Sequence, residues 1–291
     1  MARILVLFLA LLLLHGVPGV STGLAQDLVD SSAQVVDEIE LRDGSILRGR
    51  IVSETDSIIV FETLTGITVE VAVTDVVRRR QVSGRMSDEK FVTFDPNATR
   101  LLFGPTAKAL SAGSGYLAAH ELFFLSGAVG LGGKLTLMGG ASIIPGAPEQ
   151  LVFIAPKFTV HERENRAFAV GFMVGTITGV SGYGGILYGV GTFGPPDQSL
   201  SVGTGFLFGG GEVHDSPIIM LGGQKQLSSR VKLLTENYAM PTETGGALLS
   251  FAVRFIGGRL TTDLGGVTES SLLDEGGFPV LPWLAFTLHF D

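Results

Sequence analysis

Two short motifs have the residue types of known binding sites. The stretch GVGTFG at residues 189–194 has the spacing of a G-x-G-x-x-G loop, which holds a phosphate when a helix follows it. Two prolines and another alternating segment follow here instead. His161 and Glu162 begin like the zinc motif H-E-x-x-H, but Asn165 takes the place of the second histidine. The sequence therefore predicts neither a nucleotide site nor a metal site, and we expect no cofactor.

Nucleophilic catalysis has no clear basis either. The chain contains no cysteine, and GVSGY at residues 179–183 lacks the last glycine of the G-x-S-x-G serine motif. His120, His214 and His289 are candidate bases, but the sequence pairs none of them with a serine. We therefore predict that the protein is not an enzyme.

Six charged residues stand out because they lie in segments that otherwise contain apolar and small residues. If these segments are strands, the charges share a face with the small residues, opposite the large apolar ones. Charges on such a face either pair with one another and fill a narrow interior, or form a polar lining that selects small solutes. We favour pairing. The six candidate binding residues are Glu121, Lys157, Lys232, Glu236, Arg254 and Asp263.

The segments that carry these charges alternate with the two-residue period of β-strands. In residues 245–257, Phe251 and Phe255 alternate with Ser250, Ala252 and Arg254. Segments 165–178, 198–210 and 281–290 alternate in the same way. A soluble protein would place its large residues inside and polar ones outside. The pattern predicts instead a transmembrane β-barrel with large residues toward lipid.

Composition agrees with an all-β membrane protein. The mean hydropathy is +0.42, glycine is plentiful at 41 residues, and no apolar run beyond residue 20 is long enough for a membrane helix. Turn signals divide residues 97–291 into about twelve segments, an even number as in single-chain bacterial barrels. The expected strands are 99–108, 115–130, 133–143, 150–161, 165–178, 183–193, 198–210, 215–226, 229–240, 245–257, 259–267 and 281–290.

The first 25 residues read as a signal peptide. Arg3 provides the positive charge, residues 4–14 form an apolar run, and GLA at residues 23–25 provides small residues for cleavage. We therefore expect an exported protein.

A small β-rich module is predicted over residues 36–80, followed by a polar linker over residues 81–96. The stretch LRDGSILRG at residues 41–49 resembles the L-x-D-G-x-x-L-x-G hairpin of bacterial Sm-like or SH3-like small barrels. Some members of that fold bind RNA and many bind only protein. Arg78, Arg79 and Arg80 are the basic residues here, but the chain has a net charge of −8 and is predicted to be exported. We therefore expect a protein partner and no nucleic acid.

The end of the chain resembles the closing strand and assembly signal of bacterial outer-membrane barrels. Together with DPNATR at 95–100, LFGPT at 102–106, LTENY at 234–238 and PWLAF at 282–286, it resembles uncharacterised outer-membrane barrel proteins that carry an N-terminal Sm-like module. The resemblance implies contact with outer-membrane lipid and the barrel assembly machinery, and a module in the periplasm. The connections near residues 130–133, 162–165, 194–197, 228–229 and 257–258 then lie on the periplasmic side.

The predicted function is that of a noncatalytic outer-membrane barrel, either structural or a narrow pore for small solutes, with a periplasmic module for protein contact. Two alternatives are an outer-membrane lipid-modifying enzyme and a soluble secreted β-rich binding protein. No sequence feature identifies a solute.

Overall fold

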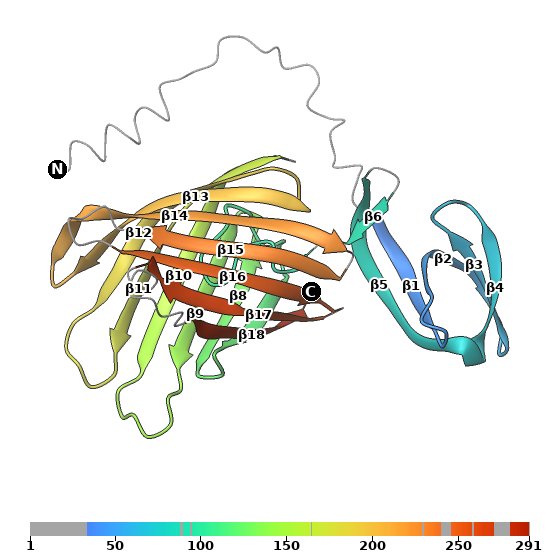
Figure 1. Ribbon diagram of the computed structural model, residues 1–291, viewed down its shortest axis with the longest axis horizontal. Coiled ribbons are helices and arrows are strands. Elements are labelled where there is room, and N and C mark those ends of the chain that lie inside the picture. The colour runs from blue at the N-terminus through green and yellow to red at the C-terminus, as the bar shows by residue number, and fades with distance from the viewer. Residues whose placement is uncertain are drawn as a thin grey trace, which may run out of the picture. The chain divides into compact units, whose positions relative to one another are not determined.

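The computed structural model describes residues 34–87, 90–93, 95–163, 165–228, 230–239, 246–257, 259–270 and 280–290. The predicted signal peptide lies outside these ranges. The described chain is all-β and consists of an N-terminal antiparallel sheet and a closed antiparallel barrel (Figure 1). In the described residues no helix has the length and apolar character needed to cross a membrane.

The N-terminal sheet has six strands in the order β4-β3-β2-β1-β5-β6. Its hairpins follow the turns that the sequence signals, with Gly44 and Gly66 at positive φ (85° and 81°). One face packs into a small core of Ile39, Ile59, Phe61 and Val71. The elements are β1 (Gln34–Leu41), β2 (Ile46–Glu54), β3 (Ile58–Thr63), β4 (Thr68–Ala72), the 3₁₀ turn η1 (Val73–Asp75), β5 (Val76–Ser87) and β6 (Lys90–Thr93).

This sheet differs from the expected Sm-like barrel because it is not closed. Strand β5 pairs with β1 along one edge, and its far end pairs with β6 rather than with β4. The expected linker over residues 81–96 also differs, since β5 continues to Ser87 and Lys90–Thr93 form β6. The polar sequence there has no sustained period, so it did not reveal the end of β5 or the edge strand β6.

The barrel closes with twelve antiparallel strands, as β18 pairs with β7. The predicted number of strands is therefore confirmed. The strands are β7 (Gly115–His120), β8 (Phe124–Leu131), β9 (Leu135–Ser142), β10 (Leu151–Arg163), β11 (Arg166–Ile177), β12 (Gly184–Phe193), β13 (Gln198–Gly209), β14 (Glu212–Ser228), β15 (Val231–Ala239), β16 (Ala247–Ile256), β17 (Leu260–Glu269) and β18 (Leu281–Phe290).

The number is right although two predicted strands are wrong. Residues 99–108 are not a barrel strand, and the single strand expected over residues 115–130 is a hairpin of β7 and β8. Its turn has Glu121 and Leu122 at positive φ (50° and 62°). Consecutive positive-φ residues are typical of the turns that join hairpins, but these are usually glycine, asparagine or aspartate. The sequence therefore gives no turn signal at this point.

The two faces of the barrel strands are as predicted. Large apolar side chains point outward and remain exposed, as Phe172 on β11, Val202 on β13 and Phe251 on β16 illustrate. Their neighbours Ser201 and Ala252 are buried inside. The outer surface is thus apolar around the barrel, and the inner face is small or polar over much of its height.

The two ends of the barrel differ in their connections. At one end, which we call the short-turn end, residues 132–134 join β8 to β9 and residues 194–197 join β12 to β13. At the opposite end, which we call the loop end, residues 143–150 and 178–183 form longer connections. The C-terminus of β18 lies at the short-turn end, beside the start of β7.

Candidate functional site

Residues 95–110, which we call the plug, lie inside the barrel. The plug forms hydrogen bonds or ion pairs with inward side chains from seven strands, β9, β10, β12, β15, β16, β17 and β18. Leu101 and Leu102 are fully buried, as are Asn97 and Arg100. The alternation that suggested a strand over residues 99–108 therefore belongs to a segment whose partners are side chains rather than a neighbouring strand.

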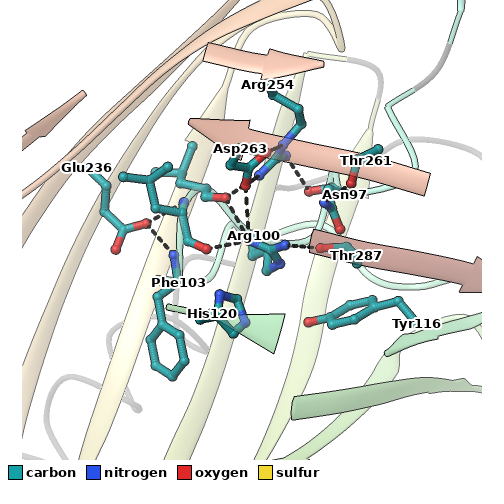
Figure 2. A network of polar contacts seen from close by, with 12 residues as sticks. Asn97, Arg100, Phe103, Tyr116, His120, Glu236, Arg254, Thr261, Asp263 and Thr287 are labelled. Atoms are coloured by element: carbon teal, nitrogen blue, oxygen red, sulfur yellow. Dashed lines mark hydrogen bonds and ion pairs between the residues drawn. The ribbon is translucent and has the colours of Figure 1, made fainter. Parts of the chain in front are cut away.

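A cluster of buried charges holds the beginning of the plug. Asp95 lies 2.9 Å from Lys232 Nζ on β15 and 3.0 Å from Arg254 Nη1 on β16. Arg254 also forms a two-pronged ion pair with Asp263 on β17, with distances of 2.6 and 2.8 Å. Arg100 adds a second cation 3.6 Å from Asp263 (Figure 2). The cluster thus places three cations against two carboxylates, and all five side chains are buried.

The electrostatics of this cluster favour the ionised form of Asp95. Burial by itself raises the pKa of Asp95, but the nearby charges of Lys232 and Arg254 outweigh it and hold the pKa well below its usual range. The backbone N–H of Asn97 donates to the same carboxylate at 2.9 Å and acts in the same direction. Asp95 is therefore ionised at neutral pH.

The tip of the plug binds a single carboxylate. Oε2 of Glu236 accepts hydrogen bonds from the backbone N–H groups of Leu102, Phe103 and Gly104 at 2.7, 3.0 and 2.9 Å. Its other oxygen accepts from the Tyr238 hydroxyl at 2.9 Å. Three successive N–H groups on one anion form a concave nest, which fixes the conformation of the loop. Figure 2 shows Phe103 and Glu236 of this contact. Gly104 is needed here, because a Cβ would overlap the Tyr238 hydroxyl.

The end of the plug is held by one lysine and a set of hydroxyls. Lys157 Nζ on β10 donates to the backbone carbonyls of Thr99, Thr106 and Lys108 at 2.9, 2.7 and 2.7 Å. One ammonium group thereby binds three backbone carbonyls of the plug, and the Thr99 carbonyl also accepts from the Thr106 N–H at 3.0 Å. Further contacts come from threonine hydroxyls of the barrel wall: Thr136, Thr159 and Thr192 bind Leu110 and Ala107, while Thr261 and Thr287 bind Asn97 and Arg100.

The structure brings together five of the six charged residues that the sequence singled out. Lys157, Lys232, Glu236, Arg254 and Asp263 are all buried and all contact the plug or its charge cluster. The sixth, Glu121, lies apart from them. It is exposed in the β7–β8 turn and accepts a hydrogen bond from the backbone N–H of Leu284 at 2.6 Å.

Sequence reasoning missed the plug residues themselves, above all Asp95 and Arg100. One signal was present, because the DPNATR stretch was among the segments that carried the resemblance to other barrels. Those separate segments meet inside the barrel: residues 102–104 bind Glu236 of LTENY, and Trp283 of PWLAF packs against Leu101 and Leu102. Their polar and small residues therefore serve one assembly.

The interior is not filled completely. A cavity of about 300 Å³ lies between the plug and the loop end of the barrel. The plug residues Phe103, Gly104 and Pro105 form part of its floor, and side chains of β9 to β15 form its wall. The wall contains methionine, isoleucine, leucine and tyrosine. This part of the lumen is therefore apolar, whereas the sequence predicted small or polar residues on the inner face.

A serine and a histidine also meet inside the barrel. His120 Nε2 on β7 lies 3.1 Å from the Ser126 hydroxyl on β8. Phe103 and Trp283 pack against the imidazole, with ring centroids 5.5 and 5.9 Å away. In the described part of the chain, His120 Nδ1 has no hydrogen-bond partner. Among the same residues, no group of three or more His, Asp or Glu is placed to hold a metal ion.

Comparison with known proteins adds little beyond this geometry. No family model and no curated protein matches the sequence. Solved structures that are similar include the KdgM porin (TM-score 0.46, 6% identity, 61% of this chain and 98% of that one). OmpT of Vibrio cholerae (0.32, 11%, 89% and 96%) and OprD of Pseudomonas aeruginosa (0.34, 8%, 90% and 94%) are also similar. The closed barrel is established by the strand pairing of this chain.

Proposed function

We propose that this chain is a noncatalytic bacterial outer-membrane protein whose barrel is closed by the plug. The membrane location is supported by the outer face, where large apolar side chains are exposed around the barrel. In water such a surface would promote aggregation. In lipid it is favourable, and a closed barrel leaves no unpaired strand edge in the hydrocarbon. The same surface argues against a soluble secreted protein.

The closed state is supported by one observation above all, the binding of three plug N–H groups by Glu236. Withdrawing the plug would leave that carboxylate without three donors, and it would separate Asp95 from Lys232 and Arg254. Buried charges that lose their partners are costly. The inward charges therefore bind the plug rather than a passing solute, and the resting barrel does not conduct ions.

The orientation follows from the connections. Outer-membrane barrels have short periplasmic turns and longer external loops, so we place the short-turn end in the periplasm. The plug enters and leaves at that end: Asp95 binds near the short-turn ends of β15 and β16, and Gly113 donates to the Gly130 carbonyl at 3.1 Å. The chain that precedes the plug, including the N-terminal sheet, is then periplasmic. Insertion by the barrel assembly machinery through the closing strand belongs to the same proposal.

A protein partner suits the N-terminal sheet better than nucleic acid does. Arg79 forms an ion pair with Glu54 at 2.6 Å, and Arg78 lies 3.9 Å from Glu40. Paired arginines offer less positive charge to a phosphate backbone. We therefore propose a periplasmic protein as the partner of this sheet.

The contact of His120 with Ser126 is the observation that favours a lipid-modifying enzyme. Both side chains are buried, and two aromatic rings pack on the imidazole. A catalytic histidine needs a group that orients its second nitrogen, and the described residues offer none to His120 Nδ1. We therefore assign this pair to packing. Loss of a lipid hydrolase activity on Ser126→Ala would contradict this assignment.

Gel electrophoresis and planar bilayers test the proposal. A membrane-fractionated protein with a heat-shifted band would establish a closed barrel in the outer membrane. The full chain should then give no steady conductance, whereas Glu236→Ala should give channel openings. A steady conductance of the full chain that Glu236→Ala leaves unchanged would instead indicate an open pore.

A further inference from the structure

The inner wall of the barrel is apolar between the plug and the loop end. Met173 on β11 pairs with Ile186 on β12, which in turn pairs with Leu207 on β13. All three line the cavity, so they form a continuous apolar row across neighbouring strands. Ile218 and Met220 of β14 extend this lining. Barrels that conduct solutes have polar interiors, so this part of the lumen does not resemble a path for ions or sugars.

The charged side chains that border the cavity already contact other groups of the protein. Lys157 borders it, but its three N–H donors are taken by plug carbonyls. Arg100 also borders the cavity; its terminal nitrogens contact Asp263, the Leu102 carbonyl and Thr287, and its Nε has no hydrogen-bond partner among the described residues. The rest of the lining is mainly apolar, so the site suits an uncharged molecule.

The size of the cavity limits what can enter it. A volume of about 300 Å³ is at the lower end of small-molecule sites and far too small for a protein segment with its own fold. Methionine side chains adapt to ligands of irregular shape, and apolar cavities stay dry and bind apolar molecules. We propose that this cavity is a binding site for a small, uncharged, mainly aliphatic molecule that enters from the loop end. The proposal rests on the plugged barrel proposed above, because the plug is the floor of the site.

Photolabelling with an octyl diazirine tests this site. The full chain is placed in phosphatidylcholine nanodiscs, irradiated with the probe and mapped by mass spectrometry. Outward residues such as Phe172 will be labelled because the probe dissolves in lipid, and they serve as the internal reference. The proposal requires additional adducts on the inward residues Met173 and Leu207. Labelled outward residues with unlabelled inward ones would overturn it.

A pair of alanine variants separates the cavity from the lipid. Ala155 lines the cavity, whereas Ala119 on β7 points outward. Ala155→Phe should abolish the inward adducts and keep the outward ones, and Ala119→Phe should keep both. Inward adducts that persist in a folded Ala155→Phe variant would contradict the site. If this variant lacks the heat-shifted band, Ala155→Leu takes its place.

Conductance of the same samples distinguishes the two proposals. A silent barrel without inward adducts would refute the ligand site and leave the plug intact. A conducting full chain would refute the closed barrel, whatever the labelling.

Discussion

The backbone N–H of Phe103 lies 3.0 Å from Oε2 of Glu236, although 133 residues separate the two in the chain. The same oxygen accepts from the N–H groups on either side. One carboxylate on β15 therefore fixes the loop at the tip of the plug.

Replacement of Glu236 by glutamine should loosen the plug. The variant keeps an acceptor oxygen but loses the charge, and hydrogen bonds to charged groups contribute about 1.5–3 kcal/mol. Trp283 is the only tryptophan and packs beside Leu101 and Leu102, so its fluorescence reports on the plug. We expect a changed Trp283 spectrum and a lower urea midpoint. The exposed Glu149→Gln is the control, and equal behaviour of the two variants would contradict the role of Glu236.

Two adjacent glycines of β14 provide a steric test. A Cβ at Gly222 would overlap the Leu101 side chain of the plug, whereas a Cβ at Gly223 would meet nothing nearer than 3.6 Å. Gly222→Leu should therefore displace the plug and produce conductance in planar bilayers. Gly223→Leu, which faces outward, should stay silent. Silence of a folded Gly222→Leu variant would mean that the contact of Leu101 with β14 does not keep the barrel closed.

Replacement of Asp95 by asparagine should destabilise the protein strongly. Lys232 and Arg254 would lose the carboxylate that they share, and removing one partner of a buried ion pair costs about 3–5 kcal/mol. Equilibrium unfolding in urea measures the change. The exposed Asp215→Asn should leave the free energy of unfolding nearly unchanged. A loss of similar size in both variants would show that the effect is not local.

Acidification should release the plug only below about pH 4. The folded pKa of Asp95 lies well below its usual value, so its contribution is complete above the unfolded pKa of about 3.9 and declines as the pH falls below it. Trp283 fluorescence should therefore stay constant from neutral pH to about pH 4 and change in more acidic solution. Asp95→Asn should lack this acid-dependent step. A transition centred near neutral pH would point to a different group.

On the outward face, the free-energy cost of a charged residue should depend on its depth in the bilayer. Phe251 lies in the middle of β16, and an arginine there should cost about 2–4 kcal/mol in a bilayer. Val213 lies beside the loop end of β14, where the same charge should cost about 0–1 kcal/mol. Unfolding from liposomes measures both. Equal costs at the two positions would contradict a lipid-facing band.

Much of this protein follows from local sequence alone. Phe172 and Val202 face outward, and Ala252 inward, because a two-residue period fixes the faces of a strand wherever it pairs. The inward location of Lys232 and Arg254 follows from the same rule. The sequence thus determined the all-β class, the location of most strands and five of the six charges inside.

The tertiary structure decided what those charges bind. Residues 99–108 alternate as strands do, but their partners are Lys157, Glu236 and threonines far away in the chain, which no local pattern specifies. The turn at Glu121 and Leu122 was hidden because its residues are not usual turn formers, and contacts with Leu284 hold it in place. The apolar cavity likewise depends on long-range packing. The plug residues 103–105 and the inward side chains of Met173 and Leu207 come from distant parts of the chain and line it together.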